Sequence, residues 1–169
     1  RILGLEPLEP LEQDPGAADY GQFIHAALHE FIAAHPTGPL PADARVRLLT
    51  IGQRIFANAA LRPGVTAFWE PRFVRVADWF LGVEAARRQG LIQAHVETKG
   101  EMTVRGPAGA FTVNARADRI DQNKSGLVII DYKTGAPPTS KEVLAGFAPQ
   151  LPLEAAIAAK GGFAKVPPS

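Results

Sequence analysis

The 169-residue chain has 46% hydrophobic and 21% charged residues, which is the composition of an ordinary soluble globular protein. Its formal net charge of +1 neither indicates nor excludes a nucleic-acid binder. The absence of cysteine excludes disulfides, thiolate metal sites and iron–sulfur clusters, and no stretch of 18 apolar residues predicts a membrane helix.

The chain divides into a short lead-in and one domain. Residues 1–16 are rich in Leu, Glu and Pro, and the prolines favour an extended segment. Residues 17–169 are long enough for a single core, with a helical part over about 17–90 and a sheet with a C-terminal helix over about 91–169. Because the chain begins at Arg1 rather than Met, we expect it to be a piece of a longer protein.

The first part of the domain has the periodicity of helices. Apolar residues at helical spacing predict helices over about 17–34, 43–60 and 65–89. Pro71 is expected either to start a new helix or to kink the third one. Four arginines lie mostly outside the apolar stripe of this helix, and we interpret them as a solvated face: Arg72, Arg75, Arg87 and Arg88.

After Gly90 the periodicity becomes that of strands. We expect strands over 92–98, 101–105 and 111–121, with a break at Gly100 between the first two. A turn then leads to four consecutive apolar residues, 127–130, which predict a strand buried on both faces.

The end of the chain is predicted to be helical. Thr139 or Ser140 is expected to cap a helix, and a further helical segment is expected over 153–160, after the interruptions at Pro149 and Pro152. Helices, a meander of strands and a last helix together predict an α+β domain.

The strand over 127–130 leads directly into Asp131 and Lys133, whose side chains share a face because strand side chains alternate. Antiparallel pairing with the preceding strand brings Asp118 opposite or nearly opposite Asp131. A divalent cation would remove the repulsion between the two carboxylates, and oxygen ligands favour Mg²⁺ or Mn²⁺. An exposed ion pair between Asp131 and Lys133 is the alternative interpretation.

These charges belong to a longer pattern of four short motifs. The motifs are Gly21-x-x-x-His25, Ala117-Asp-Arg-Ile-Asp121, Ile129-Ile-Asp-Tyr-Lys-Thr-Gly135 and Pro149-Gln-Leu-Pro-Leu153. Together they resemble the RecB-like nucleases of the PD-(D/E)XK superfamily, and the similarity is greatest to AddB-type nuclease domains of bacterial helicase–nucleases. The resemblance implies a restriction-endonuclease-like α+β core with a mixed β-sheet flanked by helices, and an N-terminal helical part.

The resemblance also implies roles for the matching residues. His25, Asp118, Asp131 and the backbone carbonyl of Tyr132 would bind the metal. Lys133 would be the catalytic lysine, acting beside Asp118 and Asp131.

Further residues near these motifs receive weaker assignments. Gln150 matches the glutamine of a Gln-x-x-x-Tyr motif that positions DNA and the active site, but Glu154 replaces the tyrosine. Arg116 is expected to contact a phosphate or to pair with a nearby acid, and Glu97 is a candidate auxiliary acid near the metal. We interpret three other residues as structural: His29, Arg119 and Asp121.

The function that this resemblance implies is that of a Mg²⁺- or Mn²⁺-dependent deoxyribonuclease that acts as an exonuclease on single-stranded DNA from unwound DNA ends. Double-strand-break repair, an AddA-like helicase–nuclease subunit as partner and a cytoplasmic location without membrane contact are expected with it. Many relatives hold an iron–sulfur cluster with four cysteines, which this chain lacks. The alternative is a catalytically inactive module of the same fold that binds DNA or docks to a subunit.

Overall fold

A computed structural model describes residues 16–58 and 63–168 of the chain. The expected extended lead-in therefore lies outside the described residues, apart from Gly16. The elements in chain order are α1 (Ala17–Ala34), α2 (Ala44–Asn58), α3 (Pro63–Arg87), β1 (Leu91–Gly106), β2 (Gly109–Asn123), β3 (Gly126–Ile130), α4 (Ser140–Leu144) and α5 (Gln150–Ala159).

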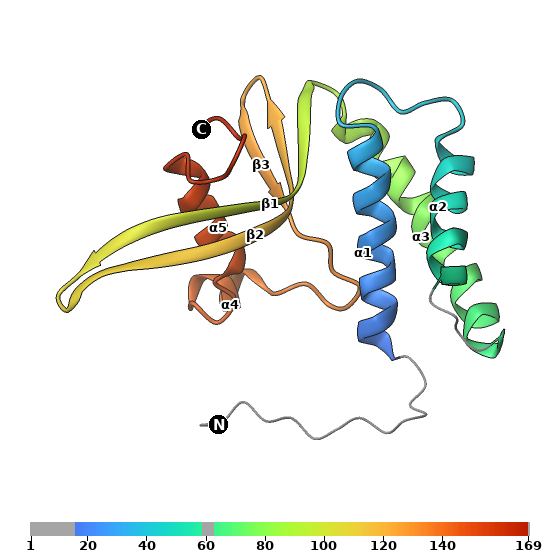
Figure 1. The fold of residues 1–169 in the computed structure, drawn as a ribbon, viewed down its shortest axis with the longest axis horizontal. Helices are drawn as coiled ribbons and strands as arrows, with labels where there is room; N and C mark the ends of the chain where they lie inside the picture. Colours follow the sequence, from blue (N-terminus) through green and yellow to red (C-terminus); the bar gives the residue numbers. More distant parts are fainter. Residues whose placement is uncertain (1–15, 59–62, 169) are drawn as a thin grey trace.

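The expected α+β fold is confirmed by this arrangement. Helices α1–α3 pack together beside one end of the sheet, and α5 packs against the strands from the other side (Figure 1). Within the described residues no helix is long and apolar enough to cross a membrane.

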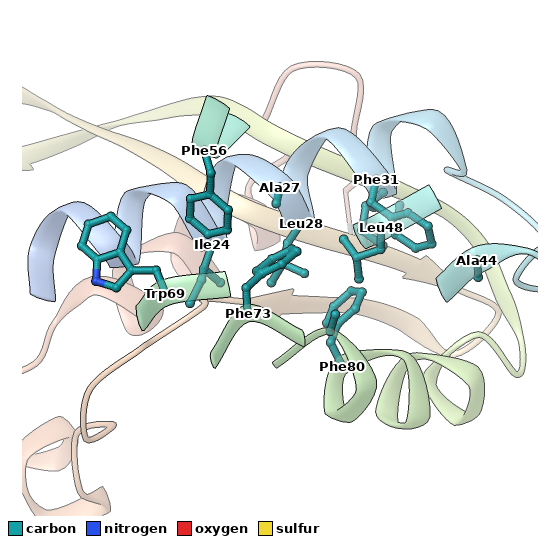
Figure 2. Packing of buried hydrophobic residues seen from close by; sticks show 13 residues of the cluster. Ile24, Ala27, Leu28, Phe31, Ala44, Leu48, Phe56, Trp69, Phe73 and Phe80 are labelled. Carbon is teal, nitrogen blue, oxygen red and sulfur yellow. The ribbon is translucent and has the colours of Figure 1, made fainter. Parts of the chain in front are cut away.

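The larger core lies among α1, α2 and α3 (Figure 2). Phe31 from α1 and Leu48 from α2 are fully buried, and Phe73 and Phe80 from α3 are nearly so. Burial of large apolar side chains is the main favourable term for such a helical bundle. This core therefore gives α1, which carries one of the predicted metal ligands, a rigid support.

Helix α3 continues through Pro71, so of the two alternatives expected there the start of a new helix is wrong. A proline inside a helix leaves the carbonyl four residues earlier without its usual partner. Both Pro71 and Ala67, the residue that carries this carbonyl, are exposed. Water can therefore satisfy the freed carbonyl, and the helix continues.

The sheet has the strand order β1-β2-β3, and both pairings are antiparallel, where we had expected a mixed sheet. The two strands predicted on either side of Gly100 form one strand, β1. Gly100 lies inside β1 and does not mark a turn. Its missing Cβ makes room for the ring of Phe163, and the two residues form a β-bridge. A side chain at position 100 would collide with that ring.

Strand β3 lies at the edge of the sheet, and the prediction of burial on both faces is wrong. Val128 is 46% exposed, and the other residues of this strand are half-buried. β3 pairs only with residues 119–123 of β2, so the long β1–β2 hairpin extends beyond it (Figure 1).

The C-terminal helices begin at identifiable residues. Thr139 caps α4, accepting a hydrogen bond from the backbone N–H of Glu142 at 3.3 Å, as predicted. Helix α5 begins directly after Pro149 and includes Pro152, because a proline is tolerated in the first turn of a helix. The expected start near residue 153 is therefore wrong, and Gln150 lies at the start of the helix.

Candidate active site at the end of β3

The predicted acidic residues lie where the β2–β3 pairing ends. The last paired residues are Arg119 and Ile130, so Asp118 and Asp131 are the next residue on each strand. The backbone N–H of Tyr132 donates to Oδ2 of Asp118 at 3.0 Å. The prediction that the two carboxylates are nearly opposite each other is therefore confirmed by the register.

His25 of α1 lies against Asp118. Its Nδ1 is 3.5 Å from Oδ2 of Asp118, and its ring meets that of Tyr132 edge-on with 6.0 Å between centroids. The two side chains remain accessible, with 31% of His25 and 18% of Asp118 exposed. The imidazole and the carboxylate thus form a partly open pair of potential metal ligands.

Gly21 explains why α1 can approach the segment after β3 so closely. A Cβ at Gly21 would lie 3.1 Å from Oγ1 of Thr134, which is tighter than ordinary van der Waals contact. Gly21 and His25 lie one helical turn apart and so occupy the same face of α1. The glycine of the Gly-x-x-x-His motif therefore allows the segment after β3 to pack closely against the helix that carries His25.

Asp131 belongs to a second group of polar side chains. Nζ of Lys133 lies 2.7 Å from Oδ2 of Asp131, and Nε2 of Gln150 donates to Oδ1 of Asp131 at 2.9 Å. Oε1 of Gln150 accepts from Lys133 at 3.3 Å. The side chain of Asp131 is 7% exposed and that of Lys133 is 42% exposed. Asp131 and Lys133 thus form the ion pair that was the alternative interpretation from the sequence, with the carboxylate largely buried and Gln150 bonded to both.

Glu154 extends this group into the interior. It is 2% exposed, and its Oε1 accepts from Nε2 of Gln150 at 3.3 Å. Its Oε2 has no hydrogen-bond partner among the described residues. Burial raises the pKa of the Glu154 carboxyl, the hydrogen bond from Gln150 opposes this shift, and the charges of Asp131 and Asp118 add to it.

Arg116 forms an ion pair with Glu97, which was the alternative expected for this arginine. Val96 pairs with Arg119 and Thr98 with Ala117, so Glu97 lies across from Asp118 in the register of β1 and β2. Glu97 has a φ of 51°, in the left-handed region that residues with a side chain seldom occupy. Such a conformation inside a strand is frequent at functional sites.

Arg119 and Asp121 belong to a buried network and are structural, as interpreted from the sequence. The guanidinium makes five hydrogen bonds: two to Glu84, two to Asp121 and one to the hydroxyl of Tyr132, at 2.5–3.3 Å. Burial acts to lower the pKa of Arg119, but the bonds to Glu84 and Asp121 outweigh it and hold this pKa well above its ordinary value. Arg88, expected on a solvated face, is 6% exposed and bonds Glu84 at 2.8 Å.

A groove of about 520 Å³ runs past His25, Lys133 and Arg116, whereas neither Asp118 nor Asp131 is among the residues that line it. Helix α1 forms one wall, and residues from β1, β2 and the segment after β3 form the rest. The polar side chains that line it are Gln22, His25, His29, Glu97, Arg116, Lys133 and Thr134, together with Tyr132. His29, which we interpreted as structural, therefore borders the same groove as His25.

The donor atoms suit a hard divalent cation, since they are carboxylate oxygens with a single imidazole. His25 and Asp118 are adjacent, and Asp131 follows β3 at the level of Asp118. In residues 16–58 and 63–168, however, no three His, Cys, Asp or Glu side chains form a group that could hold a metal ion. Asp131 is instead bonded to Lys133 and Gln150.

Comparison with known proteins identifies the family. The whole chain, residues 1–169, matches the description of the PD-(D/E)XK nuclease superfamily. The chain belongs to this superfamily. Its α+β architecture, with an antiparallel three-stranded sheet flanked by helices, is consistent with the restriction-endonuclease-like fold of PD-(D/E)XK proteins.

The chain is also similar to parts of longer rickettsial proteins. It is 30% identical over 164 residues to an uncharacterized protein of Rickettsia bellii, over 169 residues to one of Rickettsia conorii and over 167 residues to one of Rickettsia felis. These matches cover 96%, 98% and 96% of this chain but 20% of each relative. The chain thus spans about a fifth of the length of the curated relatives that it matches.

Two features of this PD-(D/E)XK site were missed by sequence reasoning. The buried network was missed although Glu84 lies on the apolar stripe of α3, four residues after Phe80, and a charge on such a stripe indicates a buried partner. The burial of Glu154 was also missed. Its position one turn before Ile157 and Ala158, both buried, was the available signal.

Proposed function

We propose that the chain is the nuclease domain of an AddB-type helicase–nuclease and hydrolyses phosphodiester bonds of single-stranded DNA as a metal-dependent exonuclease. The observation that carries this proposal is the convergence of two pairs at the end of β3: His25 with Asp118, and Asp131 with Lys133. Membership of the PD-(D/E)XK superfamily indicates a nuclease, and therefore a hydrolase.

His25, Asp118, Asp131 and the carbonyl of Tyr132 are the residues proposed to hold Mg²⁺ or Mn²⁺. When bound, the cation would act as a Lewis acid that lowers the pKa of a water molecule and polarises the scissile phosphate. Asp131 accepts hydrogen bonds from Lys133 and Gln150, and because a carboxylate has about four lone-pair sites it could hold the cation while these bonds remain.

Lys133 is the residue proposed to stabilise the charge that develops on the phosphate. Its ammonium is held by Asp131 and Gln150 on one side, while 42% of its side chain is exposed to the groove or solvent. A fixed ammonium directed at developing negative charge lowers the barrier without reorganisation during the reaction. Lys133 can also orient the attacking water by donating a hydrogen bond.

Gln150 and Arg116 are the residues proposed to contact DNA. Arg116 lines the groove and is partly neutralised by Glu97, so a phosphate entering the groove would compete with this carboxylate. Because phosphate contacts carry no sequence information, little base specificity is expected. The role in double-strand-break repair, the supply of single strands from unwound ends and an AddA-like partner subunit are proposed from the AddB-type resemblance.

A catalytically inactive DNA-binding or subunit-docking module is the second candidate. One observation favours it: Asp131 is engaged by Lys133 and Gln150, and among the described residues the site does not gather three metal ligands. In that case the charged cluster would be a structural ion-pair network.

A nuclease assay separates the two candidates. End-labelled single-stranded DNA is incubated with wild type and with Asp131→Ala, with EDTA, Mg²⁺ or Mn²⁺. We expect cation-dependent shortening from an end by wild type alone, and binding of Mn²⁺ at millimolar concentration or tighter. Absence of both cleavage and cation binding in a folded wild-type protein would contradict the nuclease proposal and favour the inactive module.

A further inference from the structure

Glu154 is a buried carboxyl for which neither the fold nor the proposed reaction accounts. It is 2% exposed and lies on α5 beside Ile157 and Ala158, which pack in the smaller core against β2. Burying a carboxyl is costly unless hydrogen bonds compensate for the lost water. An apolar side chain at this position would suit the surrounding core better.

The carboxyl of Glu154 makes one side-chain hydrogen bond among the described residues, and its partner is Gln150. Oε1 accepts from Nε2 of Gln150 at 3.3 Å, and Oε2 has no partner in the described part of the chain. The one side-chain hydrogen bond of this carboxyl therefore leads to the candidate active site. It does not join α5 to the sheet that the helix covers.

The amide of Gln150 is held by three neighbours. Its Nε2 donates to Oδ1 of Asp131 at 2.9 Å and to Glu154, and its Oε1 accepts from Nζ of Lys133 at 3.3 Å. A primary amide has two N–H donors and one carbonyl acceptor, so both donors are used by acids and the oxygen by the ammonium. Glu154 provides the acceptor on the interior side of this arrangement.

We propose that Glu154 is a positioning residue, which fixes the Gln150 amide so that Asp131 and Lys133 are held in their working orientation. The inference rests on the proposed nuclease function and assigns a role to the residue that replaces the motif's tyrosine. What Glu154 supplies is a hydrogen-bond acceptor at a fixed point. Without it, one N–H of Gln150 loses its partner, and the amide can turn away from the two charged side chains.

This role has a consequence that a structural role lacks. A buried carboxyl with one hydrogen bond destabilises the fold relative to an apolar side chain of similar size. Replacing Glu154 by methionine therefore raises stability while it lowers catalysis. A residue that merely supported α5 would lose stability and activity together.

The test compares Glu154→Met with Glu154→Gln, which keeps a carbonyl acceptor at the same place without the charge. For Glu154→Met we expect kcat to fall about 10- to 100-fold with KM near the wild-type value. Its melting temperature should rise by about 2–4 °C. For Glu154→Gln we expect kcat within about threefold of wild type, because the acceptor remains.

Three results would overturn the proposal. They are a wild-type kcat in Glu154→Met, a parallel loss of stability and activity in that variant, or equal loss of kcat in both variants. The last result would assign the effect to the charge and not to the acceptor.

A second measurement is independent of cleavage. In the metal-free chain, the side-chain amide protons of Gln150 are observed by NMR and their exchange with water is timed. We expect protection in wild type and in Glu154→Gln, and its loss in Glu154→Met. Should wild type cleave no DNA, the nuclease proposal fails while this comparison still decides on Glu154: equal protection in Glu154→Met would overturn the positioning role.

Discussion

Two clusters of charged side chains border Tyr132, and they differ in how completely their hydrogen bonds are satisfied. The Arg119 cluster, which also contains Glu84, Asp121 and Arg88, is buried, and its central guanidinium uses all five donors. Buried charges are tolerated when each is paired in this way. None of the donors of this guanidinium is therefore left for a ligand.

The candidate-site cluster, formed by Asp131, Lys133, Gln150 and Glu154, is the opposite case. Lys133 is 42% exposed, and one oxygen of Glu154 has no partner in the described residues. Unused hydrogen-bonding capacity costs stability, and sites that bind ligands often retain it. The difference between the two clusters indicates that unused hydrogen-bonding groups, more than the number of charges, distinguish a candidate site from a structural network.

The largest effect on stability is expected from breaking the Arg119 cluster. Arg119→Met leaves the buried Asp121 without an ion-pair partner among the described residues, and leaves Glu84 with Arg88 and the more distant Arg87. Removing one member of a buried ion pair costs about 3–5 kcal/mol. Urea unfolding monitored by circular dichroism measures this loss. A change below about 1 kcal/mol would contradict the structural assignment of the cluster.

Removal of a cation from the candidate-site cluster should instead lower the rate of cleavage and leave stability nearly unchanged. Lys133→Met removes a cation that is 42% exposed, so the free energy of unfolding should change by no more than about 1 kcal/mol. Cleavage should fall about 100- to 1,000-fold, as for loss of one group that stabilises transition-state charge. Single-turnover cleavage and urea unfolding of the same preparation provide both values. Wild-type cleavage by this variant would refute the assignment of Lys133.

A smaller effect is expected at Tyr132, which lies between the Arg119 cluster and the candidate-site cluster. Tyr132→Phe removes the hydroxyl that accepts from Nη1 of Arg119 at 3.3 Å, but keeps the ring that contacts His25 and Phe80. We expect stability to fall by about 1 kcal/mol and kcat to change less than about threefold. Loss of activity beyond that range, at an intact melting temperature, would show that the Arg119 cluster contributes directly to catalysis.

The smallest effect concerns pH and Glu154. Its folded-state pKa is raised by burial, with Asp131 and Asp118 adding to the shift while Gln150 and Lys133 oppose it. The resulting contribution to stability is fully present below the unfolded pKa of about 4.3 and is lost as pH rises through the folded pKa. The side chain of Glu154→Gln cannot ionise, so the stability of this variant does not show this decrease with rising pH.

We therefore expect the stability of metal-free wild type to decline relative to Glu154→Gln as pH rises above the unfolded pKa of this carboxyl. Urea unfolding in EDTA at several pH values measures the difference. Parallel curves for the two proteins would show that the pKa of Glu154 is not raised in the folded state.

The chemistry of the candidate site could be predicted from the sequence because it depends on residue types at short range. The strand that leads into Asp131 and Lys133, and the short turn that pairs it with the strand carrying Asp118, are local features, although β3 itself ends at Ile130. The α+β class followed in the same way from a change of periodicity after Gly90. These elements are confirmed, whereas the roles of the site residues remain predictions.

Local patterns failed where distant packing determines the outcome. Gly100 was interpreted as a break because glycine often marks a turn, but its function is to admit the ring of Phe163, 63 residues later. Val128 was expected to be buried, yet β3 is an edge strand, and periodicity alone does not reveal which strand lies at the edge.

The sequence by itself thus determined which atoms are available for catalysis: an imidazole, two carboxylates and an ammonium around the end of β3. Only the tertiary structure decided which charges are satisfied and which are not. Arg119 meets Glu84 across 35 residues, and Glu154 becomes buried when α5 covers the sheet. Burial and partner choice result from contacts between distant segments, and the cost of an unpaired charge exists only once water has been excluded.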